Sequence, residues 1–330
     1  MPDLILAGAA IVDVPVVPAD ASVFSRVSTP AEHIMLTTGG DAMNEAMVLS
    51  RLGKQVRLIT RIGTDDAGRY IKQTCTQAGI DTSHFLELDE LATGVNVVLV
   101  DASGERRFFT NPHGSRRALE AQDITPQAMR GASIFCFASI FVFPKINPEQ
   151  LAQLFARVRK QGLLVCADMT LPKRGERLPE MTPAFAQLDY LFANEAEAGA
   201  VTEESDPVRM ADRLISVGAR HVIIKLGANG CLLADQTGLR VRVPACPDTH
   251  CIDTTGAGDT FAAGFFAGLL DGRDFVDCAR FANAAASVSV EAVGASTGVH
   301  SIEQVLQRYH TAYPQKISNL FTHFLCSMLY

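Results

Sequence analysis

The sequence lacks several features that would point to a membrane, a nucleic acid or secretion. It has no tryptophan, and no stretch approaches the ~18 uninterrupted apolar residues that span a bilayer. No basic stripe offsets the formal net charge of −7, which argues against nucleic acid or an anionic membrane as the main partner. The N-terminus lacks the basic region and cleavage pattern of a signal peptide, so we expect a cytoplasmic location.

Three common motifs are also missing. No Gly-x-Gly-x-x-Gly follows the first apolar run, which disfavours a dinucleotide-dependent dehydrogenase. The pattern G-x-x-x-x-G-K-[ST] is absent, which disfavours an ordinary P-loop kinase. The 8 cysteines are scattered and none stands in a Cys-x-x-Cys pair, so buried thiols are favoured over a disulfide framework or a cysteine-held metal.

What is present is an alternation of strand and helix patterns in a chain of 330 residues that is 48% hydrophobic and 20% charged. Short apolar runs such as "DLILAGA", "VRLIT", "SIFCFA", "LLVCAD", "YLFA" and "HVIIKLG" predict buried strands. Helical patterns lie between them and end at a glycine in several cases. This order predicts an α/β fold with a mainly parallel sheet covered by helices on both faces. The expected helices are 42–52, 67–78, 148–161, 196–202 and 208–218.

Two stretches interrupt this alternation. Residues 14–38 contain prolines between β-rich runs, and residues 94–111 form a hairpin pattern with Gly104 at its turn. We expect them to pair into a small β lid. The alternative is a hairpin at the sheet edge that has no role as a lid. The remaining ranges, 1–13, 39–93 and 112–313, would form the α/β core, and the tail 314–330 has no assigned role.

The stretch "DTTGAGDTFAAGF" places bare backbone before an apolar helix. The first N–H groups of a helix lack partners within the helix and carry partial positive charge, so an unobstructed helix start binds anions. Gly256, Ala257 and Gly258 remove the obstructing bulk. Asp259 would repel a resting anion, but it suits a base that deprotonates an alcohol during phosphoryl transfer. From local chemistry alone, a base and a simple helix cap remain equal alternatives for Asp259.

Several motifs together resemble the ribokinase-like (PfkB) family of carbohydrate kinases. "DTTGAGDTFAAGF" is similar to the C-terminal signature of that family, and residues 39–71, beginning "GGDAMNEA", to the N-terminal one. "NEAE" at Asn194, "KLGANG" at Lys225 and "FANAAASVSVEAVGASTG" follow in the family's order, so the resemblance covers residues 3 to about 310. It implies a three-layer sandwich with a β lid and an ATP-dependent transfer of phosphate to a small sugar.

The resemblance also implies roles for individual residues. Asp259 becomes the catalytic base, and Gly256, Ala257 and Gly258 become the anion hole. Carboxylates and amides hold sugar hydroxyls well. The implied substrate-binding residues are Asp13, Gly40, Asp41 and Asn44, with Asn96 and Asn111 from the lid hairpin added as candidates. The implied nucleotide-binding residues are Asn194, Lys225, Gly227, Gly230 and Asn283.

Two metal sites are implied by the same resemblance. Glu197 would help to organise Mg²⁺ through water and phosphate, although Asn194 and Glu197 also suit a helix start with Asn194 as its cap. Asp253 and Thr255 would hold a monovalent cation, expected to be K⁺, together with three backbone oxygens. Those oxygens belong to Ser289, Ala292 and Gly294.

The chain departs from the ribokinase pattern in its substrate wall. Asp41 replaces a lysine, and apolar residues 140–144, "IFVFP", replace an acidic sugar contact. An arginine in or beside the lid could pair with the carboxylate of an acidic sugar, the candidates being Arg26, Arg107, Arg116 and Arg117. We expect a homodimer that hides the lid edges. A nucleoside kinase and a non-catalytic nucleotide-binding regulator are the alternative functions.

Overall fold

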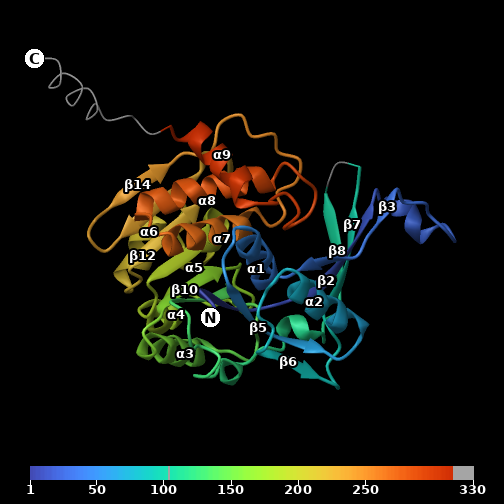
Figure 1. The fold of residues 1–330 in the computed structure, drawn as a ribbon, viewed down its shortest axis with the longest axis horizontal. Coiled ribbons are helices and arrows are strands. Elements are labelled where there is room, and N and C mark those ends of the chain that lie inside the picture. The colour runs from blue at the N-terminus through green and yellow to red at the C-terminus, as the bar shows by residue number, and fades with distance from the viewer. Residues whose placement is uncertain (103–104, 315–330) are drawn as a thin grey trace, which may run out of the picture.

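The structure is a computed structural model that describes residues 1–102 and 105–314. In this part of the chain the main sheet has nine strands in the order β14-β13-β12-β11-β10-β9-β1-β5-β6 (Figure 1). Neighbours from β6 to β12 run parallel, and β13 and β14 are added antiparallel. Their bounds are β1 Leu4–Ala7, β5 Val56–Gly63, β6 Phe85–Leu88, β9 Ile134–Ile140, β10 Leu164–Met169, β11 Tyr190–Asn194, β12 His221–Lys225, β13 Cys231–Asp235 and β14 Arg240–Val243.

The apolar strands are buried on both faces, as parallel strands under helices must be. In β1, Leu4 and Leu6 belong to one hydrophobic core, and Ile5 and Ala7 belong to the other. Side chains alternate between the faces of a strand, so a continuous apolar run supplies both cores. The expected α/β sandwich with a mainly parallel sheet is therefore confirmed.

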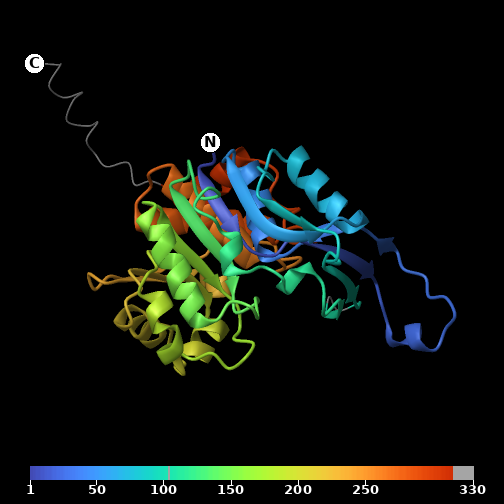
Figure 2. The same ribbon diagram turned by 90° about the horizontal axis from the view of Figure 1, so that it is seen from below.

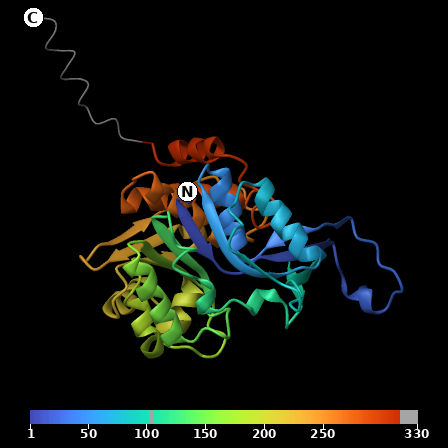
Figure 3. The same cartoon turned by 60° about the horizontal axis from the view of Figure 1, so that its bottom comes forward.

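Helices cover both faces of the main sheet (Figures 2 and 3). The predicted helices are all found, within two residues at each end, and the structure adds α4, α8 and α9, which the sequence patterns did not single out. One face carries α1 Asp41–Arg51, α2 Asp66–Gln77, α7 Ala257–Leu270, α8 Phe275–Ser289 and α9 Ile302–Ala312. The other carries α3 Pro148–Lys160, α4 Leu178–Phe185, α5 Glu195–Thr202 and α6 Pro207–Ser216.

Helix α7 is the most apolar of the helices at the centre of the molecule, and it packs closely on α8. Phe265 and Phe266 are fully buried. A Cβ on Gly264 would lie 2.9 Å from the Cβ of Ala285, and one on Gly268 would lie 3.1 Å from the Cα of Cys278. These two glycines therefore let the helix backbones approach, which fixes the position of the N-terminus of α7.

A second, smaller sheet stands beside the main body (Figure 1). Over the described residues it has five strands, with β2 at its centre and the hairpin β7–β8 on one side. The turn predicted at Gly104 lies outside the described residues. The bounds are β2 Ile11–Val17, β3 His33–Ile34, β4 Thr37–Gly39, β7 Val95–Val100 and β8 Arg106–Thr110.

The described residues bear on three of the remaining expectations. None of their helices is long and apolar enough to cross a membrane. Their seven cysteines are all free thiols, and six of them are buried. Of the tail 314–330, all residues after Pro314 lie outside the described part of the chain.

Candidate active site

Two helices start at a glycine that no side chain caps, and both starts lie at the same site. α1 begins after Gly40, with φ +92°, and α7 after Gly256, with φ +67°. A Cβ would lie 2.5 Å from the carbonyl oxygen of Ala9 at Gly40, and 2.1 Å from that of Ala295 at Gly256. Only glycine is compatible with both the conformation and the space. By contrast, Asp or Asn side chains cap the starts of α2, α3, α5, α6 and α8.

The start of α7 presents free backbone donors. In the described part of the chain, the N–H groups of Gly256 and Gly258 have no protein acceptor. The N–H of Ala257 donates to the carbonyl oxygen of Thr254 at 3.2 Å, so it is already partly engaged. Unpartnered N–H groups at the positive end of a helix dipole are suited to an anion.

Asp259 stands in the first turn of α7, next to these donors. The residue as a whole is partly buried, and its Oδ2 accepts a hydrogen bond of 2.7 Å from Nδ2 of Asn44 on α1. The capping alternative is wrong, because the N-cap is Gly256 and no side chain caps the helix. Burial, and then the charge of Asp41, raise the pKa of Asp259 well above its usual value.

A lysine holds the centre of the site together. The Nζ of Lys225, at the end of β12, lies 2.8 and 2.9 Å from the two carboxylate oxygens of Asp168, at the end of β10. A Cβ on Gly258 would lie 3.3 Å from the same Nζ, so the ammonium borders the start of α7. Burial lowers the pKa of Lys225, but Asp168 and Glu197 outweigh it and raise the pKa above its usual value, so the lysine stays charged.

Further carboxyl groups around Lys225 are short of compensating charge. Burial and the nearby Asp168 raise the pKa of Asp41 to about 6. Glu45 is fully buried, and neither carboxyl oxygen has a hydrogen-bond partner among the described residues. Burial and the charge of Asp168 raise its pKa well above the usual value. The site therefore carries more negative charge than its lysine can neutralise, which favours a ligand that arrives with cations.

Asn194 and Glu197 form the cap that their spacing allowed. The Asn194 Oδ1 accepts from the N–H of Glu197 at 2.9 Å, and the Glu197 Oε2 accepts from the N–H of Asn194 at 2.7 Å. Burial raises the pKa of Glu197 to about 7, against the opposing charge of Lys225. The cap orients Glu197 toward the Lys225 cluster, so the structural role and a role beside the phosphates are compatible.

The predicted sugar-binding residues lie where the two sheets meet. Asp13 on β2 and Asn96 on β7 are register partners, and Nδ2 of Asn96 donates to Oδ1 of Asp13 at 2.8 Å. Burial raises the pKa of Asp13, and hydrogen bonding to Asn96 and the charge of Arg116 partly offset this. Arg116 also acts on Asp41, so its guanidinium is near both carboxylates.

An open cavity of about 320 Å³ shares Arg116 with this part of the site. Arg116 and Lys173 line it, and both also lower the pKa of Asp41, against the larger effects of burial and Asp168. Of the four arginines considered from the sequence, Arg26 and Arg107 do not line this cavity. Its lining consists of Thr110, Asn111, Pro112, Arg116, Arg117, Val142 and Lys173.

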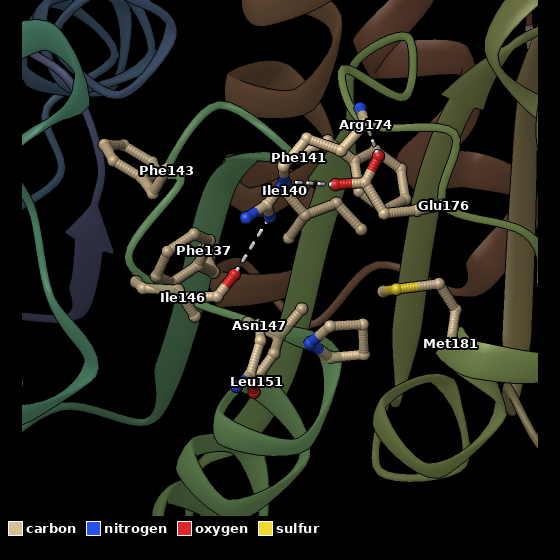
Figure 4. Close-up of a pocket in the computed structure, with 11 residues that line it drawn as sticks. Phe137, Ile140, Phe141, Phe143, Ile146, Asn147, Leu151, Arg174, Glu176 and Met181 are labelled. Atoms are coloured by element: carbon tan, nitrogen blue, oxygen red, sulfur yellow. Dashed lines mark hydrogen bonds and ion pairs between the residues drawn. The ribbon is translucent and has the colours of Figure 1, made fainter.

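The apolar segment after β9 contributes Val142 to the lining of that cavity. Arg174 donates to the carbonyl oxygens of Pro144 at 2.8 Å and Ile146 at 3.3 Å, and pairs with Glu176 at 3.0 Å. Figure 4 shows this arginine and Glu176 among the residues that line a small cavity. The cavity measures only about 20 Å³, and its lining is mostly apolar. That cavity holds about one water molecule and is no substrate site.

Three predicted nucleotide-binding positions have structural contacts in this structure. Gly227 and Gly230 have φ of +56° and +84°, and a Cβ on Gly230 would lie 2.0 Å from the carbonyl oxygen of Val243. Asn283 donates through Nδ2 to the carbonyl oxygen of Pro244 at 3.0 Å. These residues shape the turn after β12 and the end of β14. Their contact with a nucleotide stays a prediction.

The predicted cation loop is held by other donors. The Oδ1 of Asp253 accepts from the N–H and the hydroxyl of Thr255, at 2.8 and 2.7 Å. Its Oδ2 accepts from the N–H of Gly294 at 2.8 Å and lies 2.5 Å from Nη2 of Arg106 on β8. The backbone oxygen of Ser289 accepts from the N–H of Ala292 at 3.4 Å. Since one of the four donors to Asp253 is itself a cation, this carboxylate does not fit an additional K⁺.

Several residues of the site were not found by sequence reasoning. Asp168 ends an apolar strand, and an acidic residue at the carboxyl end of a parallel strand was an available signal. Glu45 directly follows Asn44 inside a recognised motif, where only its complete burial distinguishes it. Lys173 and the pairing of Arg106 with Asp253 depend on contacts between distant segments, and no local pattern indicates them.

The fold and this site define a kinase of the α/β sandwich type, and comparison with known proteins identifies its family. The model of the family described as "pfkB family carbohydrate kinase" matches residues 1–302. The chain therefore belongs to the PfkB family of carbohydrate kinases, and the resemblance found in the sequence is confirmed.

Individual relatives agree with this. The chain is 30% identical to aminoimidazole riboside kinase of Salmonella typhimurium, over 87% of this chain and 92% of that protein. It is 28% identical to ribokinase of Haemophilus influenzae, over 84% of this chain and 88% of that protein. Among solved structures, Arabidopsis thaliana ribokinase with ribose and ATP has a TM-score of 0.79 at 24% identity, covering 93% of this chain and 98% of that one. At that identity the structural likeness supports the fold alone.

Proposed function

We propose that the protein transfers the γ-phosphoryl group of ATP to an alcohol of a small sugar or sugar derivative. One observation carries this proposal. The uncapped start of α7, with free N–H groups at Gly256 and Gly258, lies directly beside Asp259, which Asn44 orients. An anion cradle and a base within one helical turn are what phosphoryl transfer to an alcohol requires.

In this mechanism Asp259 accepts the proton of the attacking hydroxyl. Asn44 holds Oδ2 by a hydrogen bond, so the acceptor alcohol approaches a carboxylate of fixed orientation. Its raised pKa makes it a stronger base than an ordinary aspartate once it is ionised. The N–H groups of Gly256 and Gly258, with the dipole of α7, stabilise the charge on the transferred group. Lys225 contributes a fixed positive charge beside Gly258.

Mg²⁺ is the proposed partner of the ATP phosphates. When bound, it neutralises phosphate charge during transfer. No three acidic, histidine or cysteine side chains in residues 1–102 and 105–314 converge as a ligand set, which fits an ion held mainly by phosphates and water. Asp168 and Glu197 place their negative charge around Lys225, where they would orient such water ligands. The predicted potassium site is not used in this mechanism, because the carboxylate of Asp253 already pairs with Arg106.

The charges around the cavity support an acidic sugar as the acceptor. Arg116, Arg117 and Lys173 put three positive charges on one cavity of about 320 Å³. Arg116 also acts on the charge of Asp13, which with Asn96 offers the oxygen and nitrogen atoms that hold sugar hydroxyls. A guanidinium binds a carboxylate with two parallel hydrogen bonds, so a sugar acid would satisfy both groups of residues at once.

The small sheet also supports the proposed homodimer. Phe108 and Phe109 on β8 are 57% and 56% exposed, and Ile34 on β3 is 67% exposed. Apolar residues on a sheet with open edges favour pairing with a second copy. Light scattering at micromolar concentration would detect this dimer, and a monomer would contradict it. We further propose a cytoplasmic location, where ATP is available and the free thiols stay reduced.

The test of the function is an ADP-release assay with MgATP over a library of neutral sugars, acidic sugars and nucleosides. We expect transfer to acidic sugars above all others. Transfer to nucleosides alone would support the alternative suggested by the similarity to aminoimidazole riboside kinase. No transfer to any acceptor, with intact MgATP binding, would favour a non-catalytic regulator.

Two variants test the acidic acceptor. Arg116→Ala and Lys173→Ala should each raise KM for the acidic sugar about tenfold or more and leave kcat little changed, because they remove binding of a distant carboxylate. Arg107→Ala is the control, since Arg107 is 74% exposed and pairs with Glu105 instead. Equal effects of all three substitutions would contradict the assignment.

A further inference from the structure

We propose that Arg106 serves as a built-in cation at Asp253, so that phosphoryl transfer by this protein needs no monovalent metal ion. Arg106 would be a positioning residue, acting on the start of α7 through Asp253. The inference rests on the proposed kinase function, and it assigns to a side chain of the small sheet the task that the sequence predicted for K⁺.

The contacts of Asp253 leave little room for another cation. Four donors reach its two carboxylate oxygens, two from Thr255, one from Gly294 and one from Arg106. The side chain of Asp253 is 7% exposed and that of Arg106 is 23% exposed. A carboxylate with four donors has its lone pairs in use. A metal ion at Oδ2 would have to displace the guanidinium, so the two cations are alternatives.

Asp253 transmits this contact to the anion cradle. It binds both backbone segments that meet at Gly256, because Thr255 precedes this glycine and Gly294 precedes Ala295. The backbone of Ala295 is the part of the chain that Gly256 packs against. Neutralising Asp253 therefore fixes the junction from which the N–H groups of α7 point toward the phosphate.

Arg106 also faces the sugar side of the site. Burial raises the pKa of Asp13, and the charges of Arg116 and Arg106 are among the effects that oppose this. The same guanidinium thus lies within electrostatic range of the substrate wall and in direct contact with the phosphate segment. A free K⁺ at Asp253 would lack this connection to β8, so the arginine ties the small sheet to the catalytic helix.

The experiment compares wild type with Arg106→Gln in two salts of equal ionic strength, potassium chloride and tetramethylammonium chloride. Thermal unfolding with MgADP is measured first. We expect the wild-type Tm to agree within about 1 °C between the salts, and that of Arg106→Gln to rise by about 3 °C or more in potassium. Arg107→Gln, which changes an exposed neighbour paired with Glu105, should behave as wild type.

Turnover is measured in the same salts with the best acceptor from the ADP-release assay. Wild-type kcat/KM should differ by less than about twofold between salts, whereas Arg106→Gln should lose about tenfold in tetramethylammonium and recover in potassium. A wild type that requires potassium, or an Arg106→Gln variant with no response to it in either measurement, would overturn the proposal.

Two further outcomes are separable. If Arg106→Gln does not fold, the wild-type protein measured in the two salts still tests the proposal. A potassium dependence of the wild type would show that Arg106 does not replace the ion. If no acceptor is phosphorylated in any salt, the proposed function fails. The unfolding measurements with MgADP then still test Arg106 independently.

Discussion

Asp253 and Asp259 stand six positions apart, on either side of the glycine segment that opens α7, and their surroundings are opposite. Asp253 has four donors, and although burial would raise its pKa, the N–H of Gly294 together with Thr255 and Arg106 lowers it below its usual value. Asp259 accepts one hydrogen bond, from Asn44, and burial with the charge of Asp41 raises its pKa. The carboxylate of Asp253 therefore has its acceptor positions occupied by hydrogen bonds, whereas that of Asp259 is left available to accept a proton.

This difference separates structural from chemical use of the same residue type. A carboxylate that is fully hydrogen-bonded stabilises its surroundings and makes a poor base. A carboxylate with few partners destabilises the fold slightly but retains affinity for a proton. The two aspartates should therefore respond in opposite ways to substitution, with stability affected at Asp253 and turnover affected at Asp259.

The largest expected effect is on turnover at Asp259. Asp259→Asn keeps the shape and removes the base, so kcat should fall by about 10³-fold or more. Because an unfavourable buried charge is also removed, Tm should stay the same or rise. Steady-state kinetics, calorimetric MgATP binding and thermal unfolding check the three parts. Unchanged kcat with intact binding would remove Asp259 from the mechanism.

Asp253→Asn should show the opposite balance. The new amide would place donors against the donors of Gly294 and Arg106, leaving buried groups unpaired. The free energy of unfolding should fall by about 2 kcal/mol, measured by denaturant titration. Turnover should fall less than in Asp259→Asn, by about 10- to 100-fold, through displacement of the α7 start. If Asp253→Asn stayed as stable as wild type but lost turnover, the proposed difference between Asp253 and Asp259 would be contradicted.

The charge of Asp41 allows the pKa of Asp259 to be tuned without touching it. Asp259 must be ionised to act, and Asp41 is the second cause, after burial, of its raised pKa. Asp41→Asn should therefore move the acidic limb of the kcat/KM profile to lower pH, by about one pH unit. Asp66→Asn is the control, since Asp66 takes the corresponding first-turn position in α2 but is 98% exposed. A shift to higher pH would contradict this account.

The smallest expected effect is on stability at Glu45. Burial raises its pKa, so the folded state holds a proton that the unfolded chain releases above pH ~4.5. Stability is then lost as pH rises from that value toward the raised pKa. Glu45→Gln removes this dependence, so its free energy of unfolding should rise relative to that of wild type between pH 5 and pH 7. A constant difference across that range would show that Glu45 is ionised in the folded protein.

The sequence was sufficient for the fold and for the parts of the site carried by continuous motifs. Apolar strand patterns and glycines at helix ends predict the α/β sandwich. The uncapped start of α7 can be read from the sequence Gly256-Ala257-Gly258. The partner of each charged side chain could not be predicted from the sequence. Nothing near Asp253 in the sequence indicates that Arg106 reaches it, because that contact depends on how the small sheet lies against the body. Which arginine lines the substrate cavity was undetermined for the same reason.

The most direct test of the central claim is a crystal structure with MgADP, a metal fluoride in place of the γ-phosphoryl group, and the acceptor sugar. We predict fluoride within about 3 Å of the N–H groups of Gly256 and Gly258, and the acceptor oxygen hydrogen-bonded to Asp259. A fluoride group away from the start of α7, or an acceptor oxygen out of reach of Asp259, would contradict the account.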